Sequence, residues 1–212
     1  RNVAIVDPGD AKPVIDYLKS NDLYPKAILI THKHYDHIGG VVGIKLQYPG
    51  VKIYGPKISS FDFDYTVLEE GSTLSIEGID IKLNVLETPG HTDEHIAYYN
   101  DEVLFCGDTL FACGCGRLFE GTAEQMFNTL QKFKSLKPHT KVYCAHEYTL
   151  ENIRFAMTLD KDNTHLNKRF DEDRLKSNTL PSTIEKEMAT NPFLLAENSE
   201  QFKVIRLKKD AF

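Results

Sequence analysis

The chain has 212 residues, of which 41% are hydrophobic and 26% are charged. This is the composition of a globular protein, and it excludes a disordered tail, a collagen-like fibre and a disulfide-dense miniprotein. With 25 Lys and Arg against 31 Asp and Glu, the formal net charge is −6, which argues against a nucleic-acid partner. No apolar run approaches the ~18–20 residues of a membrane-spanning helix, so we expect no membrane partner either.

The first third of the chain alternates strand and helix signals. Asp10 can cap a helix that carries apolar residues at positions 14, 15 and 18. A second helix is expected after the Gly39-Gly40 pair. Short apolar runs bounded by turn residues predict strands at 3–6, 27–30 and 51–54.

The pattern changes along the rest of the chain. Strands are predicted at 79–86, 96–99, 103–106 and 141–144. Between the last two, Thr122 and Gln125 have the spacing of a capping box at the start of a helix. From about residue 150 only helices are predicted, one of them starting at Ser182 and Glu185, which again have capping-box spacing. We therefore expect an α/β domain over 1–149 and a small α-helical domain over 150–212.

The histidines are concentrated in one motif. Three of the eight, His32, His34 and His37, lie with Asp36 in six residues that follow the strand at 27–30. Alternate residues of an extended segment point the same way, so His32 and His34 can share one metal ion. Asp36 and His37, one step further on, can turn toward a second. Such a donor set suits Zn²⁺, while its carboxylate also permits iron or manganese.

Three more metal-ligand candidates each follow a predicted strand. They are His91, Asp108 and His146. Each alone is a weak signal, but strand ends on one rim of a sheet are where active sites collect. The other histidines fit different roles: His95 starts a strand and is expected to support the site or the fold, whereas His139 and His165 are expected at the surface.

The sequence THKHYDH at 31–37 resembles the THxHxDH signature of the metallo-β-lactamase superfamily. The resemblance implies an αββα four-layer sandwich and two divalent metal ions, most simply zinc, with iron or manganese possible. It also gives Asp36 and Asp108 catalytic roles as metal-holding carboxylates. In that family's arrangement one metal is held by His32, His34 and His91, the other by Asp36, His37 and His146, and Asp108 bridges them.

Four further motifs resemble glyoxalase II, the hydroxyacylglutathione hydrolase family: GCGRLFEG at 114–121, HEYT at 146–149, NPFL at 191–194 and RxxKD at 206–210. This likeness runs from Val3 to the C-terminus and includes the helical part, which would bind glutathione. The glutathione contacts that it implies are Arg117, Phe119, Tyr148, Arg206 and Lys209. A monomer acting on a small thioester is expected.

The resemblance implies that S-D-lactoylglutathione is hydrolysed to glutathione and D-lactate, the second step of methylglyoxal detoxification. A metal-bridging hydroxide would attack the thioester carbonyl. The alternative is another dinuclear hydrolase of the same fold, namely a lactonase, a β-lactamase or a general thioesterase. Those enzymes would not need the GCGRLFEG loop or the basic pair Arg206 and Lys209.

Three departures from the family pattern accompany the resemblance. The family usually has His at the position of Lys33, which is not a ligand, and often Tyr at the position of Phe119, which removes a hydroxyl. The family also starts with a strand before the segment that opens here on Arg1, so we expect an N-terminal strand to be missing. The four cysteines, Cys106, Cys113, Cys115 and Cys144, form no Cys-x-x-Cys pair, and free thiols in the cytoplasm are expected.

Overall fold

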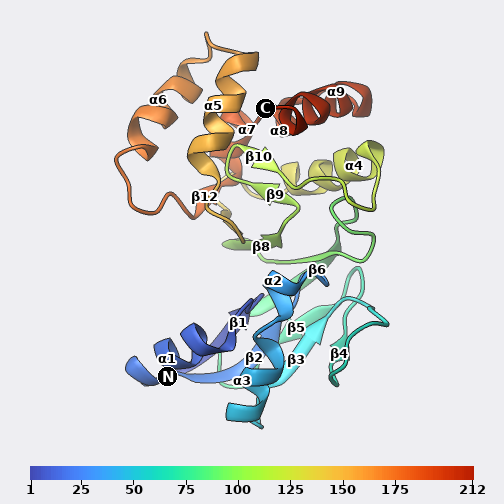
Figure 1. Ribbon diagram of the computed structural model, residues 1–212, viewed down its shortest axis with the longest axis vertical. Helices are drawn as coiled ribbons and strands as arrows, with labels where there is room; N and C mark the ends of the chain where they lie inside the picture. The colour runs from blue at the N-terminus through green and yellow to red at the C-terminus, as the bar shows by residue number, and fades with distance from the viewer. The chain divides into compact units, whose positions relative to one another are not determined.

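The computed structural model covers residues 1–212, which form two compact units (Figure 1). The first comprises Arg1–Glu87 and Glu94–Asn100, and the second comprises Thr88–Asp93 and Asp101–Phe212. No helix is long and apolar enough to cross a membrane. The mixed α/β organisation and the helical C-terminal part that the sequence predicts are both present.

The first unit is built on a parallel sheet. Its strands, in spatial order, are β1 (Asn2–Val6), β2 (Tyr24–Leu29), β3 (Lys52–Gly55) and β4 (Thr66–Val67). Two helices, α1 (Ala11–Ser20) and α3 (Val41–Gln47), pack on it through a core that includes Ile28, Ile44 and Ile53. The Asp10 carboxylate caps α1 by accepting from the Lys12 amide, as predicted. The buried strand β2 leads directly into the histidine motif.

Three antiparallel strands complete the first unit: β5 (Thr73–Ser75), β6 (Lys82–Glu87) and β7 (Ile96–Tyr99). The buried Tyr98 of β7 donates its hydroxyl to the carbonyl of Ile30, at 2.8 Å, and so ties this strand to the end of β2. Burial raises the pKa of Tyr98 well above its ordinary value, so the hydroxyl keeps the proton that it donates to Ile30.

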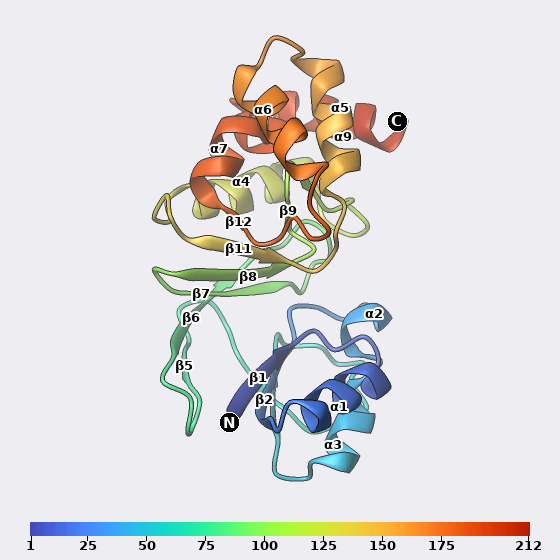
Figure 2. The same cartoon turned by 90° about the vertical axis from the view of Figure 1, so that its left-hand side faces the viewer.

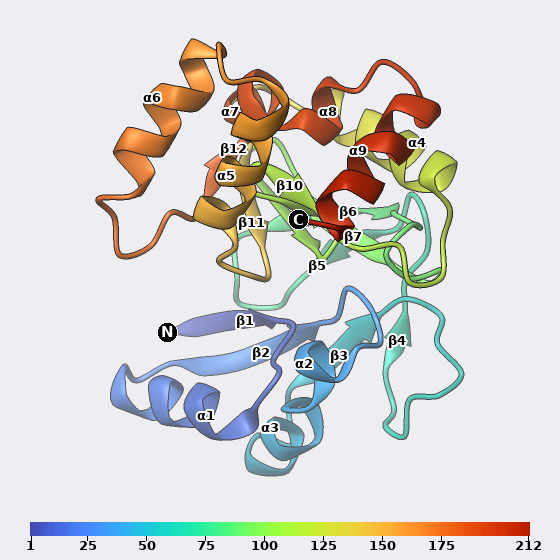
Figure 3. The same ribbon diagram turned by 45° about the horizontal axis from the view of Figure 1, so that its top comes forward.

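The second unit contains β8 (Val103–Gly107), which pairs in parallel with β11 (Lys141–Cys144), and the two lie side by side in Figure 2. The short strands β9 (Leu110–Phe111) and β10 (Gly114–Cys115) form a hairpin. Helices α5 (Thr149–Leu159) and α9 (Ser199–Asp210) lie on either side of β10 (Figure 3). The helices are α4 (Ala123–Lys134), α5 (Thr149–Leu159), α6 (Thr164–Asp173), α7 (Ile184–Thr190), α8 (Pro192–Leu195) and α9 (Ser199–Asp210).

The two predicted capping boxes have different outcomes. Thr122 and Gln125 form both reciprocal hydrogen bonds at the start of α4, so that prediction is confirmed. The prediction at Ser182 was wrong by one residue, because Thr183 caps α7. Ser182 lies instead in β12 (Ser182–Thr183), which pairs with β11, so strands do not end at residue 144.

Candidate active site

The histidine motif follows β2 and continues into the short helix α2 (Tyr35–Ile38). His32 is buried, and its Nε2 lies 3.0 Å from Nδ1 of His34. His37 is also buried, and its Nε2 lies 3.7 Å from Oδ2 of Asp36. The first unit therefore brings together all four ligand candidates of the motif. The ring of His95 stacks on that of His32 at 4.8 Å, which agrees with its predicted supporting role.

Asp7, which sequence reasoning took only as part of a turn, organises this motif. Its carboxylate accepts from the backbone amide and the hydroxyl of Thr31, at 2.8 and 2.7 Å, and from Nδ1 of His37 at 3.0 Å. Its backbone is left-handed, with φ 48°, in a turn where a Cβ on Gly9 would meet the Asp36 carbonyl oxygen at 2.2 Å. The Asp-Pro-Gly sequence at 7–9 marks the turn, but it does not reveal the partners of the Asp7 carboxylate.

The second unit holds the other three ligand candidates. Oδ2 of the buried Asp108 lies 3.5 Å from Nε2 of His91 and 3.4 Å from Nε2 of His146. Asp108 follows β8 and His146 follows β11, two neighbouring parallel strands, so both side chains come to the same sheet edge. One carboxylate oxygen thus lies between two imidazoles.

These distances fit metal ligands better than hydrogen bonds. Ligands about 2.1 Å from a tetrahedral metal ion lie about 3.4 Å apart, whereas N–H···O hydrogen bonds measure 2.7–3.2 Å. The separations of Asp108 Oδ2 from His91 and His146 match the first value. The nitrogen and carboxylate donors of these clusters, together with the superfamily reported below, indicate divalent metal binding.

Backbone and carboxylate groups set which histidine nitrogen is available. Nδ1 of His91 donates to the carbonyl oxygen of Arg117 at 2.8 Å, so its Nε2 carries the lone pair that faces Asp108. Nδ1 of His37 donates to Asp7 in the same way. The loop that supports His91 needs Gly116, because a Cβ there would lie 1.9 Å from the Asp108 carbonyl oxygen and 2.9 Å from His91 Nδ1.

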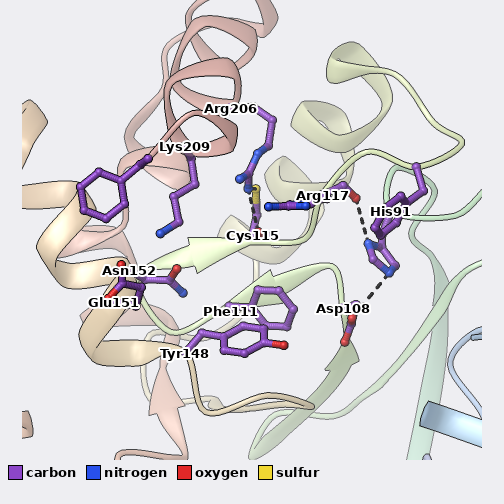
Figure 4. A pocket seen from close by; sticks show the side chains of 12 residues that line it. His91, Asp108, Phe111, Cys115, Arg117, Tyr148, Glu151, Asn152, Arg206 and Lys209 are labelled. Atoms are coloured by element: carbon purple, nitrogen blue, oxygen red, sulfur yellow. Dashed lines mark hydrogen bonds and ion pairs between the residues drawn. The ribbon is translucent and has the colours of Figure 1, made fainter.

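A pocket of about 470 Å³ opens beside Asp108 and His91, and all of its lining residues belong to the second unit (Figure 4). Phe111 and Tyr148 present their rings along one wall, while Arg117 and Lys209 point inward from the opposite side. The pocket joins a carboxylate–imidazole end to a cationic end. All five predicted glutathione contacts line it: Arg117, Phe119, Tyr148, Arg206 and Lys209.

Lys209 makes no salt bridge within 4 Å. Its Nζ lies 5.1 Å from the ring centre of Phe155 and 4.9 Å from that of Phe212. Burial lowers the pKa of Lys209, although the nearby Glu151 carboxylate opposes this effect. A desolvated ammonium group of this kind is stabilised by an incoming anion.

Arg206 has a different environment from Lys209. Its guanidinium is buried and donates to Oδ1 of Asp210 through Nε and Nη2, at 3.1 and 2.8 Å. Its Nη1 donates to the carbonyl oxygen of Cys115 at 3.0 Å. Arg206 therefore fixes the wall of the pocket, whereas Lys209 and the exposed Arg117 offer cations to its interior.

Side chains of the C-terminal helices hold the β9–β10 turn, which precedes the pocket loop. Asn191, from the NPFL motif, donates to the carbonyl oxygens of Phe111 and Gly114 at 3.2 and 2.9 Å. Glu187 accepts from the Cys113 amide at 2.7 Å, where the backbone is left-handed with φ 59°. Sequence reasoning assigned no role to Glu187, because nothing local marks a buried carboxylate 74 residues away from its partner.

The remaining predictions about histidines and cysteines agree with the structure. His139 and His165 are exposed. All four cysteines are free and buried, and none needs to serve as a ligand. Burial raises the pKa of Cys115 to about 11 although Arg206 opposes it, so this pocket-lining thiol is uncharged at neutral pH.

Comparison with known proteins identifies the family. Residues 1–146 match the metallo-beta-lactamase superfamily, and residues 147–212 match the hydroxyacylglutathione hydrolase C-terminus. The hydroxyacylglutathione hydrolase of Vibrio campbellii is 50% identical over 204 residues, which cover 94% of this chain and 80% of that protein. The chain belongs to the hydroxyacylglutathione hydrolase family. The predicted family and class of enzyme are thus confirmed.

Solved structures agree on the fold. ETHE1 from Myxococcus xanthus superimposes with a TM-score of 0.73 at 22% identity, covering 97% of this chain and 80% of that one. A protein crystallised in a di-iron-bound form has a TM-score of 0.62 at 25% identity, covering 88% and 87% of the two chains. The chain therefore has the metallo-β-lactamase fold that its sequence predicts.

Proposed function

We propose that the chain hydrolyses S-D-lactoylglutathione to glutathione and D-lactate, the second step of methylglyoxal detoxification. One observation carries the proposal: a single pocket has Asp108 and His91 at one end and the unpaired Lys209 ammonium at the other. A glutathione thioester has the matching parts, a reactive acyl carbonyl and carboxylates several bonds away. A lactone or a simple acyl thioester lacks those distant carboxylates, and no feature of the pocket favours either substrate.

We further propose that the seven ligand candidates form two metal sites. Each unit supports its share of the proposal separately: the nitrogens of His32 and His34 converge in one, and Asp108 lies between two imidazoles in the other. Nitrogen and oxygen donors suit zinc, and the di-iron relative makes iron a second candidate. The proposed assignment is His32, His34 and His91 for one ion, Asp36, His37 and His146 for the other, with Asp108 between them.

Two divalent ions held by these residues would supply a hydroxide nucleophile at neutral pH, because such ions lower the pKa of bound water from 15.7 toward about 7. The protein's own contribution is placement. Asp7 and the Arg117 carbonyl oxygen hold the imidazoles of His37 and His91 in the tautomer that is protonated on Nδ1. This leaves the lone pair of Nε2 available to a metal ion. The water oxygen bonds to the thioester carbon and the carbon–sulfur bond breaks, so that glutathione leaves as its thiolate. One water proton ends on that thiolate, and the other is released when the D-lactate carboxyl group ionises.

Substrate binding is proposed to use the five predicted residues in unequal ways. Lys209 and Arg117 attract the carboxylates of glutathione. The Tyr148 ring stacks on that of His146 at 5.0 Å, and the Phe119 ring meets that of His91 edge-on at 5.2 Å, so both aromatic groups pack beside the ligands. The missing hydroxyl at Phe119 leaves that contact apolar. Arg206 acts by holding the Cys115 carbonyl.

The division of labour along the chain is also a proposal. Residues 1–149 are proposed to carry the metal chemistry and 150–212 the glutathione contacts, with the pocket loop at 114–121 serving both. Four free, buried thiols favour a reducing compartment, and we propose the cytoplasm. We also propose that the enzyme acts as a monomer.

The test is hydrolysis by the purified, metal-loaded protein. S-D-lactoylglutathione, S-lactoyl-N-acetylcysteamine, a lactone and a β-lactam are offered at equal concentrations, and loss of each acyl bond is followed. The glutathione thioester is expected to give a kcat/KM about a hundredfold above that of the uncharged thioester, because two charge-assisted contacts are each worth about tenfold. Strong lactonase turnover without thioester cleavage would sink the proposal.

A further inference from the structure

The sequence motif RxxKD ends in Asp210, which the proposed reaction does not use. Asp210 is the last residue of α9, where the helix dipole disfavours a negative charge. Its neighbours Lys208 and Lys209 suit that position, but an aspartate does not. The unfavourable placement indicates that Asp210 has partners strong enough to offset it.

Those partners are two arginines on different elements. Oδ1 of Asp210 accepts from Nε and Nη2 of Arg206, at 3.1 and 2.8 Å, within the same helix. The same oxygen lies 3.8 Å from Nε of Arg117, which belongs to the loop after β10. Asp210 therefore connects the C-terminal helix with the cation that reaches into the pocket.

The connection continues beyond the side chains. Arg206 also donates to the Cys115 carbonyl, two residues before Arg117. The Arg117 carbonyl in turn accepts from Nδ1 of His91. Helix α9 thus grips the 115–117 loop at two points, through Arg206 directly and through Asp210 at Arg117.

We propose that Asp210 is a positioning residue for substrate specificity. Its carboxylate holds the Arg117 guanidinium over the pocket, and anionic thioesters bind better as a result, although Asp210 itself is negatively charged. The inference rests on the proposed function. It runs against simple electrostatics, since removing a negative charge near a pocket for anions ordinarily strengthens their binding. The sign of the effect therefore separates positioning from plain charge.

The experiment compares Asp210→Asn with Glu151→Gln in the metal-loaded enzyme. Each substitution is nearly isosteric and removes one negative charge beside the pocket, but Glu151 forms its salt bridge with Arg154, at 3.2 Å, and lies near Lys209 rather than Arg117 (Figure 4). We expect D210N to raise the KM for S-D-lactoylglutathione about tenfold, as for a lost charge-assisted contact, with kcat and metal content kept. We expect E151Q to lower the KM.

Two further measurements distinguish positioning from a general structural effect. Turnover of S-lactoyl-N-acetylcysteamine, which has no carboxylate, is expected to be the same in D210N and the wild type. In an Arg117→Ala background, D210N is expected to add nothing further to the KM. Should D210N not fold, Asp210→Glu, which keeps the charge, replaces it in the same cycle and is expected to raise the KM less than R117A does.

An unchanged or lower KM in D210N overturns the inference, as does an equal loss of activity on both thioesters together with loss of metal. Failure of the proposed function is recognised separately, because the wild-type enzyme would then not cleave S-D-lactoylglutathione at all. An active wild type with a D210N variant of lower KM contradicts only the role of Asp210.

Discussion

Two clusters of buried polar side chains, one in each unit, differ in how the cost of burying their polar groups is offset. In the second unit, Arg169 donates to Asp173 and Glu187 and also to the hydroxyls of Ser182 and Thr190. Burial works against the charged Arg169, but its acidic neighbours, chiefly Glu187 with a contribution from Asp173, together outweigh burial and raise the pKa of Arg169. This cluster contains its own cation.

The histidine cluster of the first unit is assembled from electron-pair donors. His32, His37 and Asp7 place their ligand atoms within 4.8 Å of one another, and the imidazole of His34 joins His32. Electron-pair donors brought this close together favour the binding of a metal ion. In a structural ion pair, by contrast, the protein itself supplies the cation. A buried cluster that contains both cationic and anionic side chains stabilises the fold, whereas a cluster of electron-pair donors without a cation of its own suits a metal ion.

The largest effect is expected from removing Asp108, the second-unit carboxylate whose Oδ2 lies close to the imidazoles of His91 and His146. Asp108→Ala is expected to lower kcat on S-D-lactoylglutathione by about 10²–10³-fold, as for the loss of a major electrostatic contribution. Metal content per chain, measured by elemental analysis, is expected to fall with it. Full activity in this variant would contradict the proposed site, and its thermal unfolding serves as the control for folding.

The converse experiment targets the structural cluster. Arg169→Met leaves Glu187 without its ionic partner, and the free energy of unfolding is expected to fall by about 3–5 kcal/mol. Chemical denaturation measures this loss. Metal content of the folded fraction is expected to be unchanged, because Arg169 lies among the C-terminal helices rather than among the ligands. A loss of metal without a loss of stability would reverse the roles assigned to the two clusters.

A milder change tests support rather than ligation. Asp7→Asn keeps the side-chain volume but removes the carboxylate that accepts from His37 Nδ1. Metal affinity or activity is expected to fall about 10–100-fold, the usual effect of losing such a partner. Competition with a chelator of known affinity gives the measurement. Asp16→Asn, on the exposed face of α1, is the matched control and is expected to bind metal normally.

The smallest expected effect concerns pH at the cationic end of the pocket. Because burial lowers the pKa of Lys209, its proton is lost at a pH below the ordinary lysine value of about 10.4. The KM for the glutathione thioester is therefore expected to rise as the pH increases through that lowered pKa, and below that pKa the protonation of Lys209 is expected to leave the KM constant. In Lys209→Met this rise should disappear from the KM profile; if it persists there, another group is responsible.

The residues that are candidates for metal ligation could be picked out from the sequence, whereas most of the residues that support them could not. Metal-ligand candidates reveal themselves by residue type and short spacing, and the six residues from His32 to His37 lie together as expected. Asp7 and Glu187 act on partners 30 and 74 residues away, so no local pattern reports them. Arg206 lines the pocket as predicted, but the sequence did not mark its contacts with Asp210 and with the Cys115 carbonyl oxygen.

The fold followed a similar rule. Long periodic segments and true caps were read correctly, as at Thr122, because the signal lies in neighbouring residues. The two-residue strands, such as β9 and β12, carry too few side chains for an alternating pattern. Ser182 has the residue type and spacing of a helix cap. In the structure, however, its hydroxyl donates to Glu187 and its backbone pairs with β11.

The hydrogen bond from His91 to the Arg117 carbonyl bears on how such an enzyme can change its substrate. The ligand is oriented by a backbone atom, which every amino acid supplies, while the substrate is met by the side chain of the same residue. Selection can therefore replace the side chain at 117 freely, exploring new acyl donors without disturbing the chemistry. An insertion or deletion between Gly116 and Phe119 would move the Arg117 carbonyl oxygen away from His91. The length of this loop is therefore more tightly constrained than the side chain at position 117.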